Sequence, residues 1–101
     1  MGRRASAVDA NQAVIVAALR TAGASVELLH SVGKGCPDIL IGYKGSNILA
    51  EIKDGSKVPS AQKLTSFQVG WHEAWRGQVD TVNSIPAALD LIGINMRGTI
   101  S

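Results

Sequence analysis

The chain has 101 residues, of which 46% are hydrophobic, and its ten Lys and Arg exceed its eight Asp and Glu for a formal net charge of +2. This length fits one domain. No apolar run approaches the roughly 18 residues of a membrane span, Met1-Gly2-Arg3-Arg4 leads into no apolar stretch, and the single Cys36 excludes an internal disulfide and a multi-cysteine zinc site. We expect one domain over 1–101, no membrane partner and a cytoplasmic location.

The first expected element is a helix. Asp9 with Gln12 three residues later has the form of a capping box, and Gly23 ends the helix. The expected buried stripe is Ile15, Val16, Leu19 and Ala22. Residues 25–30 read as a short strand and 31–35 as a glycine-rich turn. The first helix therefore packs one apolar stripe against a sheet.

Two strands then form a hairpin. Residues 37–43 and 47–53 alternate in hydrophobicity and are joined by Lys44-Gly45-Ser46, a compact connection. Residues 54–63 are polar and contain Gly and Pro, so we expect a mobile loop there.

The second helix has a sharp start. Thr65 caps it, Gln68 completes a T-x-x-Q capping box, and Leu64 with Val69 forms a hydrophobic staple. Gly77 ends it. We expect its helical stripe to be buried, with Trp71 and Trp75 in core packing rather than stacked on bases. That stripe is Phe67, Gly70, Trp71, Ala74 and Trp75.

A strand over 78–82 and a third helix, capped by Ser84 and ended by Gly93, complete the domain. The expected inward residues of this helix are Ile85, Ala88, Leu89 and Ile92. The order helix, three strands, helix, strand, helix predicts an α/β fold with a mixed sheet flanked by helices. Its core covers about 9–92, and 1–8 and 94–101 are terminal tails.

The hairpin brings charged residues together. If Tyr43 pairs with Ser46, Asp38 lies directly opposite Glu51, with Cβ atoms about 5 Å apart, and Lys53 shares their face. A register shift by two would put Asp38 opposite Lys53 on that same face. Opposed carboxylates repel each other, and a divalent cation such as Mg²⁺ removes this penalty.

Such a cation activates water and polarises a phosphodiester. Lys53 can then orient the attacking water or stabilise the charge that develops on phosphate, and the backbone carbonyl of Ile52 is a plausible further ligand. The alternative is a surface salt bridge between Lys53 and one of the acids. Glu-x-Lys alone would favour that alternative, but Pro-Asp one strand earlier in matching parity is much rarer.

These residues resemble a known pattern. Pro37-Asp38 followed by Glu51-Ile52-Lys53 is similar to the PD-(D/E)XK nuclease superfamily. The stretches GCPDILIG, ILAEIK and LTSFQ, in this order, resemble its VRR-NUC family, the virus-type replication-repair nucleases. The resemblance covers roughly Asp9 to Ile92. Short stand-alone members of the family occur in phages and prophages, which places this chain in a bacterial cell or a phage-infected host.

The resemblance implies hydrolysis of phosphodiester bonds that depends on Mg²⁺ or Mn²⁺, with branched DNA such as Holliday junctions as substrate and a homodimer as the active form. Asp38 and Glu51 would be metal ligands, Lys53 the catalytic lysine, and Gln68 the glutamine that the family carries after its catalytic strands. Gln68 could equally serve as an ordinary helix cap, and the two roles are compatible.

One position departs from the family pattern. A glutamate of the first helix usually contributes to the metal site, but this helix has no acid after Asp9, and Val14 falls where we expect that glutamate. Gln12 is then the candidate for a neutral substitute ligand that would bind metal more weakly.

Three lysines flank the expected site on segments rich in Gly or Ser: Lys34, Lys57 and Lys63. They are candidate phosphate contacts or simply solvated loop charges.

The leading hypothesis is a homodimeric, structure-specific DNA endonuclease with no small-molecule substrate. The alternatives are a nicking or restriction-type nuclease on ordinary duplex, and a catalytically silent or attenuated DNA-binding module of the same fold.

Overall fold

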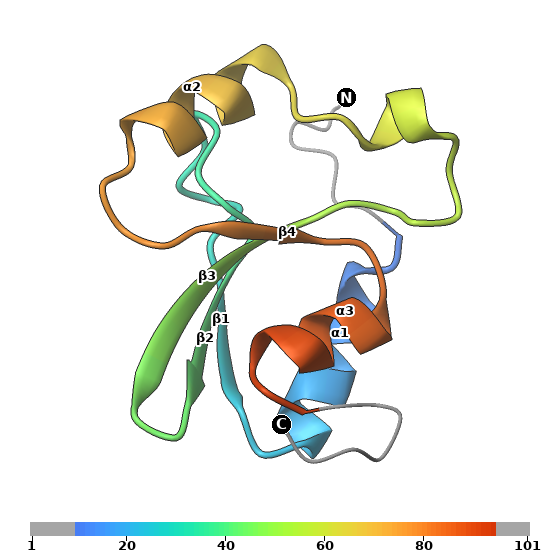
Figure 1. The fold of residues 1–101 in the computed structure, drawn as a ribbon, viewed down its shortest axis with the longest axis vertical. Coiled ribbons are helices and arrows are strands. Elements are labelled where there is room, and N and C mark those ends of the chain that lie inside the picture. The colour runs from blue at the N-terminus through green and yellow to red at the C-terminus, as the bar shows by residue number, and fades with distance from the viewer. Residues whose placement is uncertain (1–9, 95–101) are drawn as a thin grey trace.

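The computed structural model describes residues 10–94 (Figure 1). Its elements are α1 (Gln12–Thr21), β1 (Ser25–Leu28), β2 (Ile39–Tyr43), β3 (Ser46–Ile52), a 3₁₀ helix η1 (Pro59–Gln62), α2 (Ser66–Ala74), β4 (Asp80–Val82) and α3 (Ile85–Leu91). The predicted order of helices and strands is confirmed, with η1 added inside the expected polar loop. In the described part of the chain, no helix has the length and apolarity needed to cross a bilayer.

The four strands form one sheet in the order β1-β2-β3-β4. β1–β2 and β2–β3 are antiparallel, whereas β3–β4 is parallel, so the predicted mixed sheet is confirmed. Lys44 and Gly45 both have positive φ, 48° and 81°, which fits a two-residue turn with the twist of the hairpin. Tyr43 pairs with Ser46 across this turn, and the predicted register is therefore correct.

The core lies between one face of the sheet and the pair α1 and α3, which lie side by side over it (Figure 1). Every second residue of β2 and β3 points into it, as strand alternation predicts. The fully or nearly fully buried aliphatic side chains are Ile15, Leu19, Ile39, Ile41, Ala50, Ile52 and Ala88. Because the hairpin supplies four of them, its other face is fixed in orientation too.

The start of α1 differs from the expected one. The helix begins at Gln12, and Asn11 occupies the cap position without a side-chain cap bond. The Asn11 amide instead donates to the backbone carbonyls of Lys53 at 2.9 Å and Asn83 at 3.3 Å. These tertiary contacts replace a local cap, and Asp9 lies outside the described residues. Gln12 is thus the first residue of the helix, not the third.

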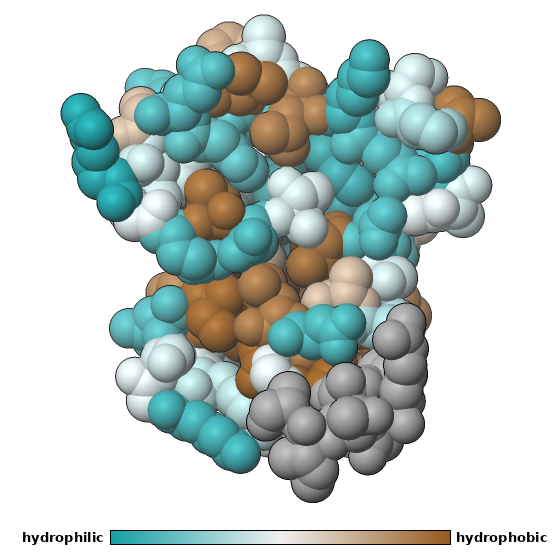
Figure 2. Space-filling model, viewed as in Figure 1, coloured by the Kyte–Doolittle hydropathy of each residue, from teal (hydrophilic) through white to brown (hydrophobic). Residues whose placement is uncertain are grey.

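The prediction that α2 is a core helix is wrong. None of its residues is buried, and Phe67 and Trp75 are 73% and 44% exposed. The reason is position: α2 lies beyond the end of the strands, while α1 and α3 occupy the covered face (Figure 1). Trp71 and Trp75 stack on each other at 4.6 Å instead of entering the core. Figure 2 shows hydrophobic side chains at the surface over α2.

Candidate active site

The first part of the site is the open end of the β2–β3 hairpin. Asp38 immediately precedes β2, and continuing the register places it opposite Glu51, the penultimate residue of β3. Asp38 Oδ2 accepts a hydrogen bond from the Ile52 amide at 2.6 Å. Glu51 is only 1% exposed, which is rare for a carboxylate. Asp38 is thus oriented by a hydrogen bond to the backbone of β3, whereas Glu51 is enclosed by its neighbours.

Strand geometry predicts that the Ile52 carbonyl faces the same neighbouring strand as the Ile52 amide. The amide and carbonyl of one strand residue face the same side, and the Ile52 amide already contacts Asp38. The register continues to place Pro37 opposite Ile52, and proline has no N–H to donate. Pro37 therefore cannot donate to the Ile52 carbonyl across the hairpin. That carbonyl remains a candidate for a further ligand beside the two carboxylates.

Gln68 links the acid to the lysine. Its Nε2 donates to Glu51 Oε2 at 2.8 Å, and its Oε1 accepts from Lys53 Nζ at 2.8 Å. The same Oε1 accepts from the Thr65 amide at 2.9 Å, which completes the predicted capping box. The predicted cap is thus confirmed, and Gln68 also contacts two of the residues expected in the site. Lys53 is 9% exposed, and its Nζ is oriented by the bond to Gln68.

A close backbone approach seats α2 on the hairpin side. Gly35 has φ 84°, and a Cβ there would lie 2.3 Å from the carbonyl oxygen of Phe67. Only glycine fits both the conformation and the gap. The turn before Asp38 and the first turn of α2 are thereby packed backbone to backbone. The sequence signalled a turn at Gly35, but nothing in it pointed to α2 as the neighbour.

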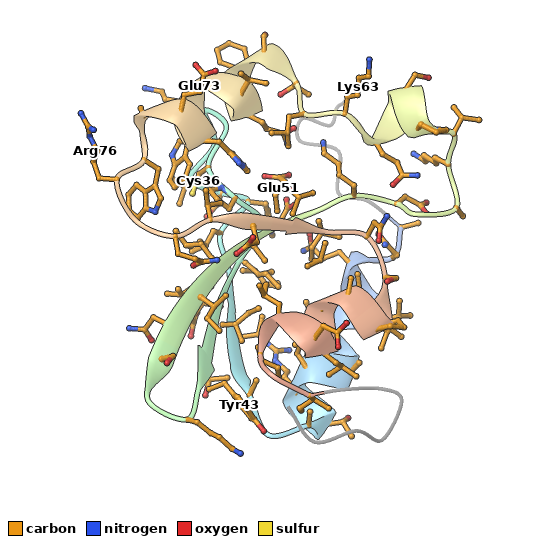
Figure 3. All side chains as sticks on the ribbon, in the orientation of Figure 1. Cys36, Tyr43, Glu51, Lys63, Glu73 and Arg76 are labelled. Atoms are coloured by element: carbon orange, nitrogen blue, oxygen red, sulfur yellow. The ribbon has the colours of Figure 1, made fainter. Side chains whose placement is uncertain are left out.

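The electrostatics of the site favour a cation. The pKa of the Cys36 thiol is raised above its ordinary value, first by burial and then by the negative charges of Glu51 and Asp38. Figure 3 shows Cys36 and Glu51 at the same end of the sheet, in agreement with this effect. Among residues 10–94 no three His, Cys, Asp or Glu side chains form a metal cluster. Two carboxylates plus neutral oxygens nevertheless suit a hard cation that keeps several waters, such as Mg²⁺ or Mn²⁺.

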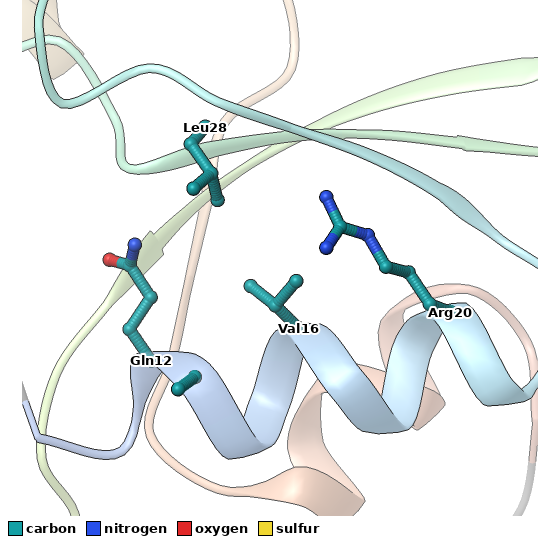
Figure 4. A pocket seen from close by; sticks show the side chains of 5 residues that line it. Gln12, Val16, Arg20 and Leu28 are labelled. Carbon is teal, nitrogen blue, oxygen red and sulfur yellow. The ribbon is translucent and has the colours of Figure 1, made fainter.

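The first helix presents Gln12, not Val14. Gln12 is 5% exposed, and its Oε1 is buried without a hydrogen-bond partner among the described residues. It lines a pocket of about 280 Å³ with Ala13, Val16, Arg20 and Leu28 (Figure 4). Val14 is 53% exposed, and the correspondence of its position to the metal-site glutamate of the family stays a prediction.

The three flanking lysines are exposed. Lys34 has φ 56° and precedes the Gly35 contact, and Lys63 directly precedes the strand-like entry to α2, pointing away from the molecule in Figure 3. Lys57 lies in the turn before η1, where its amide bonds the Asp54 carbonyl at 3.1 Å. Because all three are exposed, they are free to contact phosphate groups, as the sequence suggested.

The hairpin and the contacts of Gln68 agree with the Pro-Asp and Glu-x-Lys pattern found in the sequence. No family model and no curated protein matches the sequence. Among solved structures, one described as "VRR_NUC domain" is similar with a TM-score of 0.58 and 25% identity, over 80% of this chain and 88% of that chain. The resemblance to the VRR-NUC family and its fold is thus confirmed by structure.

Proposed function

We propose that this chain is a metal-dependent DNA endonuclease that cuts branched DNA as a homodimer, in the cytoplasm of a bacterial or phage-infected cell. One observation carries the proposal: the hairpin sets Asp38 opposite Glu51, and Gln68 ties Glu51 to Lys53 through two hydrogen bonds of 2.8 Å. An ordinary surface salt bridge would not bury Glu51 or place the Gln68 amide between Glu51 and Lys53. The likeness to a VRR_NUC domain supports the same chemistry.

In this proposal the metal ligands are Asp38, Glu51 and the Ile52 carbonyl, with Gln12 as a neutral ligand from α1. A bound Mg²⁺ or Mn²⁺ would supply a more acidic water and a charge that polarises the scissile phosphate. The catalytic residues are Asp38, Glu51, Lys53 and Gln68.

Lys53 Nζ holds the attacking water or the developing phosphate charge, and Gln68 fixes where Nζ sits. Because Gln68 uses one oxygen for both Lys53 and the Thr65 amide, the position of the lysine depends on the cap of α2. Lys34, Lys57 and Lys63 would neutralise backbone phosphates around the site.

Branched DNA and the dimer rest on the family resemblance. A symmetric junction has two strands to cut, and two copies of one active site match that symmetry. The exposed hydrophobic surface over α2 suits a dimer contact and a DNA contact equally well (Figure 2). A nuclease on plain duplex and a silent DNA-binding module are the competing functions.

The test is cleavage of a four-way junction, a flap and a linear duplex of matched sequence, each with Mg²⁺, with Mn²⁺ and with EDTA. We expect metal-dependent cutting of the branched substrates and little of the duplex. Equal cutting of all three would favour the restriction-type alternative. Binding without cutting under every condition would overturn the proposed activity in favour of the silent module.

A further inference from the structure

Phe67 is an aromatic side chain left in solvent beside the candidate active site. It is 73% exposed, the most exposed large hydrophobic residue in the described part of the chain. Its backbone is nevertheless fixed, because its carbonyl packs on Gly35 and it lies inside the capping box of α2. A ring that is 73% exposed buries little apolar surface and so adds little to the stability of the fold.

The surroundings of Phe67 have the chemistry of a nucleotide site. The next residue, Gln68, bonds Glu51 and Lys53, so the ring is one residue away from the proposed catalytic contacts. The exposed Lys34 directly precedes Gly35, whose backbone packs on that of Phe67, and the exposed Lys63 lies four residues before Phe67. An exposed aromatic ring with cations on neighbouring segments suits a base with its phosphates.

We propose that Phe67 stacks on an unpaired nucleobase at the branch point while Lys34 and Lys63 hold the adjoining phosphates. The proposal rests on the proposed function and deepens it, because it assigns the recognition of branched DNA to a residue outside the catalytic set. Paired duplex hides its base faces in the stack, so a solvated ring gains contact only where a base is splayed out. Selectivity for branches follows.

A second copy of this chain is the other possible occupant of the face. The charges favour nucleic acid, since the face carries the exposed Lys34 and Lys63 against one exposed acid of α2, Glu73. Two copies meeting there would leave positive charge in excess, and the phosphates of nucleic acid would balance it. Self-association through Phe67 is therefore treated as an outcome of the test.

The experiment measures binding to a flap DNA with 2-aminopurine at the first unpaired position, and to a fully paired duplex of the same sequence, both in EDTA. Four proteins are compared: the unchanged chain, Phe67→Ala, Phe67→Trp and Val14→Ala. Val14 is a matched control, being apolar, 53% exposed and on the solvent face of α1. Sedimentation of each protein without DNA reports its oligomeric state.

Stacking of Phe67 on 2-aminopurine should quench the fluorescence of that base when the unchanged chain binds the flap. We expect Phe67→Ala to bind the flap about 5- to 100-fold more weakly, to lose this quenching, and to bind duplex as before. Phe67→Trp should keep both properties, and Val14→Ala should match the unchanged chain. Equal flap binding by Phe67→Ala, or no quenching by the unchanged chain, would overturn the proposal. A change of oligomeric state in Phe67→Ala would also overturn it, in favour of self-association.

This design separates the inference from the proposed activity. Quenching that depends on Phe67 in a chain that cuts no DNA with any metal would retain the stacking site and remove the nuclease. Metal-dependent cutting with no effect of Phe67→Ala on flap binding would retain the nuclease and remove the stacking site.

Discussion

The β2–β3 hairpin and α2 both bring residues to the candidate site, but they are held in different ways. The hairpin has a continuous ladder and four core residues, whereas α2 has no buried residue. What holds α2 is a capping box, the Gly35 contact and the two bonds of Gln68. Asp38 and Glu51 are thus carried by the well-packed hairpin. The side chain of Lys53 is oriented by Gln68 of α2, a helix that is itself held partly by the bonds of Gln68 to Glu51 and Lys53.

The largest effect should follow from changing the rigid part. Glu51→Gln keeps the shape of the side chain but removes a charged ligand, and we expect cleavage to fall on the order of 10²-fold or more, since a bound metal supplies several kcal/mol. Glu27→Gln is the control, because Glu27 is an exposed acid on β1 of the same sheet. Steady-state cleavage of a junction with Mg²⁺ measures both. Comparable losses in the two variants would mean that net charge, not a site, sets the activity.

The next effect concerns the seat of α2. Gly35→Ala forces a Cβ against the Phe67 carbonyl at a positive φ, and it should lower the free energy of unfolding by about 2–4 kcal/mol. Gly33→Ala also has a positive φ, 73°, but meets no atom within 4 Å. It should cost only about 1 kcal/mol. Urea unfolding of both variants compares them. Equal costs would show that α2 does not rest on this turn.

A smaller effect should distinguish the two helix caps. Thr65→Ala and Ser84→Ala each remove a side chain that accepts from a helix amide, at 3.2 Å in both. Each should cost about 1 kcal/mol of stability. Only Thr65→Ala should also slow cleavage, because Gln68 joins that cap to Lys53. Thermal unfolding and cleavage rates, measured side by side, provide the comparison. A matching drop in cleavage for Ser84→Ala would point to general destabilisation.

The smallest effect is electrostatic. The Cys36 pKa is raised by burial and then by Glu51 and Asp38. Removing the Glu51 charge lowers the cost of forming the thiolate, so in Glu51→Gln this pKa falls and the thiolate fraction at a given pH rises. Alkylation by iodoacetamide at mildly alkaline pH should therefore be a few-fold faster than in the unchanged chain. Burial persists, so the thiol should stay less reactive than a free cysteine. An unchanged alkylation rate would mean that the charge of Glu51 does not affect the Cys36 thiol.

The hairpin could be predicted from sequence because its signals are local. A two-residue turn at Lys44-Gly45 and strict alternation fix both register and face, and these place Asp38, Glu51 and Lys53 together. The capping box of α2 was equally local and was predicted correctly. Gln68 could be expected near the site only through the family resemblance.

The position of α2 could not be predicted in the same way. An apolar stripe such as Phe67 to Trp75 indicates which side of a helix would be buried, not whether a surface lies there to cover it. The sheet face was already taken by α1 and α3. The start of α1 failed for a related reason: Asn11 uses its side chain on Lys53 and Asn83, which are far away in sequence.

The central claim is that Lys53 is the catalytic lysine of a nuclease site. The most direct test is Lys53→Ala, because the Lys53 side chain joins the hairpin to Gln68 of α2. Cleavage and binding of a four-way junction are measured with Mg²⁺ for the unchanged chain, Lys53→Ala and Lys44→Ala, the last an exposed lysine at the far turn of the same hairpin. The predicted result is loss of cutting with nearly intact binding for Lys53→Ala alone. Full cutting by Lys53→Ala would contradict the account and leave the lysine a structural partner of Gln68.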